Sequence, residues 1–337
     1  MKHKLLYLAA ASLLSLNVQA QQDGFFTSKL ASQKKFEADY LKAVNYDQFK
    51  VHLTELTKNP HITGTPENEL VKDYMVQVMS QAGMDVKVWP YDVYLPNHPG
   101  KSELQIISPV QLTLSQKEGE LAEDPFSTDP RLHLGFNAFS GSGDVTAEVV
   151  YVNYGTREDF MKLVEMGVPL KGKVAIARYG GNFRGYKAKF AEQQGMVGLV
   201  VYTDPKDSGF TRGDVYPKGP FYNETTIQRG SMLTLDFTGD PLTPNRPALP
   251  LDGPVKVKRD DPATVDFHTI PVTPIGYGAA KEILSRMNGA DVPAAWQGGL
   301  PFSYKLTGGA DLKVRVMVDQ KPEFIRANNV VGTFIGK

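Results

Sequence analysis

The sequence of 337 residues contains no cysteine, and only two tryptophans and six histidines. Without cysteine the chain cannot be a disulfide scaffold and cannot hold a cysteine nucleophile, a zinc–thiolate site or an iron–sulfur cluster. It also lacks an excess of either charge, because 37 Lys and Arg residues balance 37 Asp and Glu residues. This balance excludes a protein that coats nucleic acid through a broad basic surface.

Apolar runs of membrane-spanning length are also missing. Lys2 and Lys4 precede an apolar run over residues 5–16, and Val18 and Ala20 put small residues at −3 and −1 before Gln21. This pattern is typical of a secretory signal peptide cleaved after Ala20. The alternative is a short membrane anchor, but the run is shorter than the roughly 20 residues that a spanning helix needs. We therefore expect residues 1–20 to be removed and the protein to be periplasmic or extracellular.

What is present favours a globular α/β protein with α+β elements. Hydrophobic residues make up 41% of the chain, too many for a disordered protein. Helices are predicted over residues 32–44, 46–56, 66–82, 157–166, 184–194 and 277–287. Strands are predicted over 86–88, 103–107, 147–153, 174–177, 197–202, 313–318 and 329–335, and those over 147–153 and 329–335 are expected to be buried. The strand–helix–strand order over 147–202 indicates an α/β layer. Residues 207–254 are Gly/Pro-rich and predicted to be irregular.

Familiar catalytic motifs are mostly missing. None of the six histidines lies in an H-E-x-x-H, H-x-H or H-x-D arrangement, so a zinc site would have to be built from distant residues. The segment 167–173 matches the phosphate-loop spacing G-x-x-x-x-G-K, but Val174 stands where Ser or Thr should hold magnesium. It also runs from a helix into a strand, the reverse of a phosphate loop. We interpret it as a turn.

The most informative segment is 177–189. Its glycines let the backbone approach a ligand closely, and Arg184 stands at the expected start of a helix, followed by Gly185. An arginine there can bind a carboxylate through two parallel hydrogen bonds. A solvated surface arginine is the alternative, and the residues alone leave both open.

Eight segments together resemble the glutamate carboxypeptidase II (N-acetylated α-linked acidic dipeptidase, folate hydrolase) branch of the M28 zinc peptidases, and more distantly the transferrin receptor ectodomain. They occur in family order and comprise residues 60–65, 151–155, 176–189, 201–205, 228–230, 239–244, 270–277 and 328–333. The resemblance implies an M28-like α/β peptidase domain, incomplete here, with an inserted protease-associated (PA) domain. Residues 21–94 are similar to the first part of the peptidase domain, 95–323 to the PA or apical domain, and 324–337 to the first returning strand.

The resemblance also bears on the chemistry. The zinc ligands and general-base Glu of the family follow the segment similar to 329–335, so we expect the chain to hold no zinc ligands and to be inactive alone. One interpretation is the amino-terminal portion of an exported zinc exopeptidase that acts on small peptides and supplies the PA lid and substrate pocket. The alternative is an exported, non-catalytic PA module that binds peptides or a protein. Neither nucleic acid nor, after signal removal, a membrane is expected as a partner, and the family's dimerisation domain is not matched.

The resemblance implies roles for four residues. Arg184 matches the arginine of the F-R-G motif, which in glutamate-specific members binds the terminal carboxylate of the substrate. Ser208 and Ser231 occupy the places of the Tyr and Asn that assist it, so strict glutamate preference is not implied. Thr243 matches a calcium ligand of the family, whereas Arg246 replaces the accompanying Tyr.

Overall fold

The computed structural model describes residues 24–336, so the expected signal peptide over 1–20 lies outside the described residues. The chain divides into two compact units, the first ending at Leu56 and the second beginning at Thr57. Helices α2 (Thr27–Ala43) and α3 (Tyr46–Thr57) confirm the two helices predicted here. Neither helix contains a buried residue.

Within residues 24–336, no helix is both long enough and apolar enough to cross a membrane.

The second unit begins with helix α4 (Pro66–Gln81), whose start was predicted from its cap. The Thr65 hydroxyl accepts a hydrogen bond from the amide of Asn68 at 3.3 Å, and Pro66 occupies the first turn. The chain leaves the helix through Gly83, whose φ of 83° is in the left-handed region that glycine adopts most easily. The cap and the terminating glycine therefore act as the sequence indicated.

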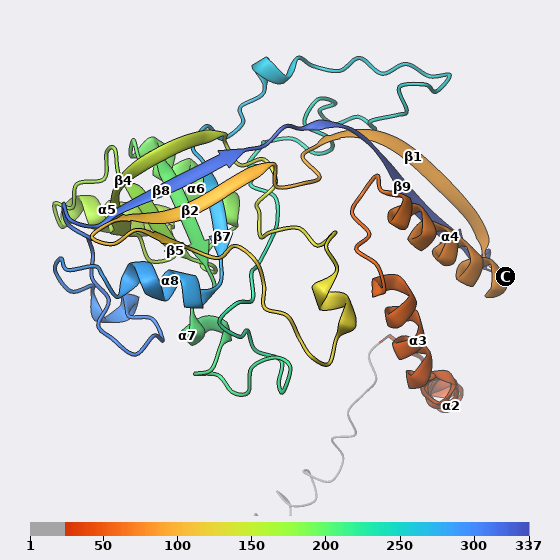
Figure 1. The fold of residues 1–337 in the computed structure, drawn as a ribbon. Coiled ribbons are helices and arrows are strands. Elements are labelled where there is room, and N and C mark those ends of the chain that lie inside the picture. The colour runs from red at the N-terminus through yellow and green to blue at the C-terminus, as the bar shows by residue number, and fades with distance from the viewer. Residues whose placement is uncertain (1–23, 337) are drawn as a thin grey trace, which may run out of the picture. The chain divides into compact units, whose positions relative to one another are not determined.

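Two long antiparallel strands lie beside α4. Strand β1 (Asp85–Leu95) pairs along its whole length with β9 (Glu323–Thr333). Figure 1 shows α4 lying along this two-stranded ribbon, and residues of α4 contact both strands. The predicted buried strand over 329–335 is wrong in extent and burial. The strand begins at Glu323 and none of its residues is buried, because within residues 24–336 β9 has only β1 as a hydrogen-bonded neighbour.

The remaining strands form one seven-stranded sheet in the order β3-β2-β8-β4-β5-β6-β7. Their bounds are β2 (Lys101–Ser108), β3 (Leu112–Thr113), β4 (Gly143–Tyr151), β5 (Val174–Arg178), β6 (Gly198–Tyr202), β7 (Val272–Ile275) and β8 (Lys313–Asp319). Strands β4 to β7 pair in parallel, whereas β2, β3 and β8 pair antiparallel. All residues of β5 and β6 are buried, as expected for strands of a parallel sheet covered on both faces.

Helices connect the parallel strands. Helix α5 (Arg157–Glu165) joins β4 to β5, and α6 (Arg184–Gln193) joins β5 to β6, which confirms the α/β layer predicted over 147–202. Helix α8 (Tyr277–Leu284) follows β7. No helix or strand lies between the short helix α7 (Pro205–Ser208) and the 3-10 turn η3 (Pro262–Thr264). The Gly/Pro-rich segment is therefore irregular, as predicted.

This topology determines where a site can form. The carboxyl ends of neighbouring parallel strands lie at one edge of a sheet, and the loops that follow them converge there. The loops after β4, β5 and β6 cover residues 152–156, 179–183 and 203–204. The phosphate-loop look-alike lies at the opposite ends of the strands, between α5 and β5, where Lys173 forms an ion pair of 2.7 Å with Glu148. It is the turn that the sequence analysis predicted.

Candidate functional site

Arg184 is the first residue of α6, directly after the loop that follows β5. Its side chain is half-buried, with the guanidinium carbon 5.3 Å from the centre of the Phe183 ring and 5.8 Å from that of Tyr179. Nη1 donates a long hydrogen bond of 3.4 Å to the carbonyl of Ser231. Nε is buried and has no partner among the described residues.

Arg184 differs from its neighbours in having no carboxylate partner within residues 24–336. Arg178 pairs with Asp207 and Arg229 pairs with Glu118, whereas no ion pair of Arg184 occurs in that part of the chain. A guanidinium presents five N–H donors in a planar fork, and here most of them are not used by the protein. Such a group can hold a carboxylate of a ligand through two hydrogen bonds.

Two glycines bring Ser231 to Arg184. A Cβ on Gly185 would overlap the carbonyl oxygen of Met232, and a Cβ on Gly230 would overlap the guanidinium of Arg184. Only residues without a side chain let the segment 230–232 lie directly against the start of α6. The Gly that follows Arg184 thus has a packing reason, which the sequence analysis did not find.

The structure brings together Arg184 and Ser231 but not Ser208. The contact with Ser231 uses its main-chain oxygen, since the Ser231 hydroxyl accepts a hydrogen bond from the amide of Leu233 at 3.1 Å. Ser208 ends α7, where its amide donates to the carbonyl of Asp204 at 3.1 Å. No hydrogen bond between Ser208 and Arg184 is found in residues 24–336.

A buried polar network lies at the same edge of the sheet, and sequence reasoning missed it. Arg178, the last residue of β5, is only 1% exposed and donates to both carboxylate oxygens of Asp207, at 2.9 and 2.8 Å. Its guanidinium carbon lies 4.2 Å from the centre of the Tyr154 ring, and its Nη2 donates to the Tyr154 hydroxyl. That hydroxyl donates to Asp207 at 2.7 Å. A charged residue at the end of an apolar strand was the one available signal.

The network changes the acidity of its members. Burial and the hydrogen bond to Asp207 raise the pKa of Tyr154 to about 12. Burial opposes the charge of Arg178, but its hydrogen bonds to Asp207 outweigh this effect and the pKa of Arg178 is raised. Tyr154 is therefore a neutral donor and Arg178 a permanent cation, which suits a structural scaffold better than proton transfer.

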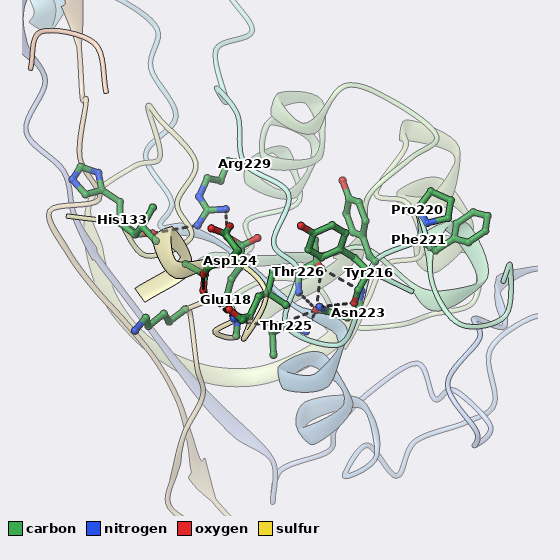
Figure 2. Close-up of a pocket in the computed structure, with 16 residues that line it drawn as sticks. Glu118, Asp124, His133, Tyr216, Pro220, Phe221, Asn223, Thr225, Thr226 and Arg229 are labelled. Atoms are coloured by element: carbon green, nitrogen blue, oxygen red, sulfur yellow. Dashed lines mark hydrogen bonds and ion pairs between the residues drawn. The ribbon is translucent and has the colours of Figure 1, made fainter. Parts of the chain in front are cut away.

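A cavity of about 450 Å³ lies between the segments 117–133 and 216–229 (Figure 2). Figure 2 shows Arg229 directed at Glu118, and the two form an ion pair of 3.0 Å. Glu118 also accepts from the amide of Ile227 at 2.9 Å, and Arg229 donates to the carbonyl of His133 at 3.2 Å. The volume of this cavity falls in the range of small-molecule pockets.

The segment 227–231 connects this cavity to Arg184. Arg229 lines the cavity, while the carbonyl of Gln228 accepts from the Tyr179 hydroxyl at 2.9 Å and that of Gly230 accepts from Asn137 at 3.1 Å. Tyr179 is one of the rings beside Arg184. The irregular segment 227–231 thus forms a wall of the cavity and part of the surroundings of the Arg184 side chain.

The residues near Thr243 and the histidines do not assemble a metal centre. Within residues 24–336, no group of three or more His, Cys, Asp or Glu side chains is placed to hold a metal ion. The Thr243 hydroxyl is buried and has no hydrogen-bond partner in the described part of the chain, so it is one oxygen of the kind that calcium binds. The carboxylate of Asp240 accepts from the amides of Tyr94 and Leu242, at 2.5 and 3.0 Å. The described residues by themselves therefore complete neither a zinc nor a calcium site, and Thr243 supplies at most one oxygen ligand.

Comparison with known proteins gives one family match and several relatives. Residues 145–234 match the model of the PA domain. The chain is 33% identical to the glutamate carboxypeptidase 2 homolog of Caenorhabditis elegans, over 87% of this chain and 39% of that protein. It is 31% identical to the aminopeptidase NAALADL1 of Mus musculus, over 98% of this chain and 47% of that protein.

The chain therefore spans less than half the length of these curated relatives. Among solved structures, the aminopeptidase from Aneurinibacillus sp. strain AM-1 matches with a TM-score of 0.41 and 18% identity, over 86% of this chain and 48% of that one. The match to the PA domain begins within β4, ends at Thr234 and includes Arg178, Arg184 and Ser231, whereas the cavity residues in segment 117–133 lie outside it.

Proposed function

This chain belongs to the glutamate carboxypeptidase-like branch of the M28 peptidases, and from that premise we propose that it supplies the PA lid and part of the substrate pocket of an exported zinc exopeptidase. The substrates are small peptides, and Arg184 binds their terminal carboxylate. In this proposal residues 21–94 and 324–337 belong to the peptidase domain and 95–323 to the PA domain. These boundaries agree with the change from the β1–β9 ribbon to the seven-stranded sheet.

The observation that supports the proposal best is the free guanidinium of Arg184. It stands at the start of α6, is backed by two aromatic rings and Gly230, and has no carboxylate partner in residues 24–336. A half-buried cation without a partner is costly unless a ligand supplies the anion. The proposed ligand has that anion.

The zinc ligands belong, in this proposal, to parts of the protein other than the described residues. Zinc would polarise the scissile carbonyl and activate a water molecule. The chain on its own is then expected to show no peptidase activity when zinc is added. Chelator-sensitive hydrolysis of dipeptides by the pure chain would contradict this.

The decisive test removes the guanidinium. In a protein that carries this chain together with the remaining peptidase half, Arg184→Ala should lower kcat/KM by about 10- to 150-fold, the equivalent of a charge-assisted contact of about 1.5–3 kcal/mol. Substrates with an amidated carboxyl end should lose much less. The exposed Arg157 on α5 serves as a matched control, and Arg157→Ala should leave kcat/KM unchanged for both the free and the amidated substrates. Equal losses on free and amidated substrates would mean that Arg184 is structural.

The cavity of Figure 2 favours a second candidate function. A non-catalytic PA module could bind peptides or a partner protein there, without using Arg184. It predicts that the monodisperse chain binds a peptide with an amidated carboxyl end as tightly as the free acid. Loss of that binding in Phe221→Ala, with Arg184→Ala unaffected, would support this alternative over the first.

Export and calcium binding are separate proposals. Export rests on the signal-peptide pattern over residues 1–20, and amino-terminal sequencing of the exported protein should begin at Gln21. Calcium rests on the unpartnered hydroxyl of Thr243 alone. We also expect the chain by itself to be monomeric, which light scattering measures directly.

A further inference from the structure

Lys187 is fully buried in α6, one turn after Arg184. Its ammonium nitrogen donates to the carbonyl of Gly180 at 2.7 Å, to Oδ1 of Asn182 at 2.8 Å and to the carbonyl of Tyr154. These acceptors belong to two different loops, the one after β4 and the one after β5. All three hydrogens of the ammonium group are therefore used to tie the two loops together.

The loop after β5 depends on such a tie. Gly180 and Gly181 have φ angles of 104° and 75°, and a Cβ on Gly181 would lie 2.8 Å from the Cβ of Tyr154. Asn182 donates from Nδ2 to the carbonyl of Gly155 at 3.2 Å. The turn 180–182 is thus pressed against the loop after β4 and leads directly into Phe183 and Arg184. Displacement of this turn would move the start of α6.

The charge of Lys187 is sensitive to its surroundings. Burial lowers the pKa of Lys187 to about 7, Asp159 and Asp207 oppose this effect, and Arg178 and Arg184 add to it. A neutral amine has two hydrogens to donate instead of three, so deprotonation leaves one of the three acceptors without its donor. The tie between the loops therefore weakens as the pH rises above neutrality.

We infer that Lys187 is a positioning residue whose ammonium group holds the turn 180–182 in place and thereby orients Arg184 toward the carboxylate of the substrate. This inference rests on the proposed function. An anion bound at Arg184 offsets the positive charge that disfavours the protonated amine. Carboxylate binding and protonation of Lys187 consequently strengthen each other, as linkage requires.

Binding of an N-acetylated dipeptide that ends in glutamate, followed by NMR at pH 6 and pH 9, tests the inference. Wild type should bind more tightly at pH 6. Lys187→Met should weaken binding at pH 6 by about 3- to 30-fold, the range of couplings that act through neighbouring residues, and should abolish the pH dependence. Lys189→Met, on the same helix, is the matched control and should behave as wild type. Unchanged affinity and pH dependence in Lys187→Met would overturn the inference and leave the proposed function standing.

The absence of cysteine allows a chemical rescue. Lys187→Cys can be alkylated with 2-bromoethylamine in the unfolded state and refolded, which restores an ammonium group of nearly the same length. This protein should regain binding, whereas the same variant capped with a neutral ethyl group should not. Equal recovery with both caps would show that Lys187 only fills space, and would overturn the inference.

A measurement on wild type keeps the inference testable if the variants do not fold. The amide signals of Asn182 and Phe183 should titrate together with the Lys187 ammonium signal, and a saturating concentration of the dipeptide should move their common midpoint to higher pH. Signals at the turn that do not follow Lys187 would overturn the inference. If the dipeptide does not bind at all, the proposed function fails, while the titration of the turn still shows whether Lys187 holds it.

Discussion

Arg178 and Asp207 form a two-point ion pair at the carboxyl edge of the parallel strands, with N–O distances of 2.9 and 2.8 Å. The arginine is 1% exposed, whereas the carboxylate keeps a quarter of its surface in contact with solvent. The pair joins the end of β5 to α7, and the ring of Tyr154 lies over the guanidinium. The loops around Arg184 are therefore supported by the buried charge of Arg178, which needs the carboxylate of Asp207 as its partner.

We predict that Asp207→Ala destabilises the protein by about 3–5 kcal/mol, because it leaves the buried Arg178 charged and without its partner. The double variant Arg178→Met/Asp207→Ala should be less destabilised than Asp207→Ala. Urea unfolding measures both. Asp144→Ala is the control, since its partner Arg315 is 26% exposed and returns to water, and only a small change is expected. Equal effects of Asp207→Ala and Asp144→Ala would contradict the role assigned to the pair.

Gly185→Ala should destabilise the protein by about 1–3 kcal/mol, the usual cost of overpacking, since the new methyl would overlap the carbonyl of Met232. The displaced segment also carries Ser231, so carboxylate binding at Arg184 should weaken. Gly143→Ala is a suitable control, because its methyl would meet Pro271 at an ordinary distance of 3.4 Å. Thermal unfolding of the two variants compares them, and a Gly185→Ala protein as stable as wild type would contradict the close packing.

Glu192 makes the stability depend on pH in the acid range. Burial alone would raise its pKa, but hydrogen bonds from His268 and Thr269 hold the pKa of Glu192 below the ordinary value of 4.5. Below pH 4.5 the unfolded chain then binds more protons at Glu192 than the folded one, so this stabilisation is present above that pH and is lost as the pH falls through the lowered folded pKa. As the pH is lowered from 6 to 3, the urea midpoint of unfolding should fall less steeply for Glu192→Gln than for wild type. Parallel curves would refute this assignment.

Thr243→Val should leave stability unchanged or raise it slightly, by about 0–1 kcal/mol, because it replaces an unpaired buried hydroxyl with a methyl group. Millimolar calcium provides the second measurement. If Thr243 is a calcium ligand as proposed, calcium should raise the Tm of wild type but not that of Thr243→Val. Identical calcium responses in the two proteins would remove Thr243 from the calcium proposal.

Local signals in the sequence were sufficient for most elements of the fold. The helix after Thr65, the start of α6 at Arg184 and the strand–helix alternation over 147–202 follow from capping residues, terminating glycines and apolar spacing. These signals act within a few residues, so they can be found without the rest of the chain. They also placed Arg184 at the start of a helix. Its role in binding a carboxylate stays a prediction.

Contacts between distant residues were decided only by the tertiary structure. Arg178 and Asp207 are 29 residues apart, Glu118 and Arg229 are 111 apart, and β9 pairs with a strand more than 220 residues earlier. The apolar run near 330 looked buried because periodicity cannot show how many neighbours a strand will have. The cavity and the network beneath Arg184 depend on how loops meet at one edge of the sheet. Sequence alone thus determined most of the elements and the place of Arg184 at a helix start, whereas packing decided which side chains face each other, since that depends on every element at once.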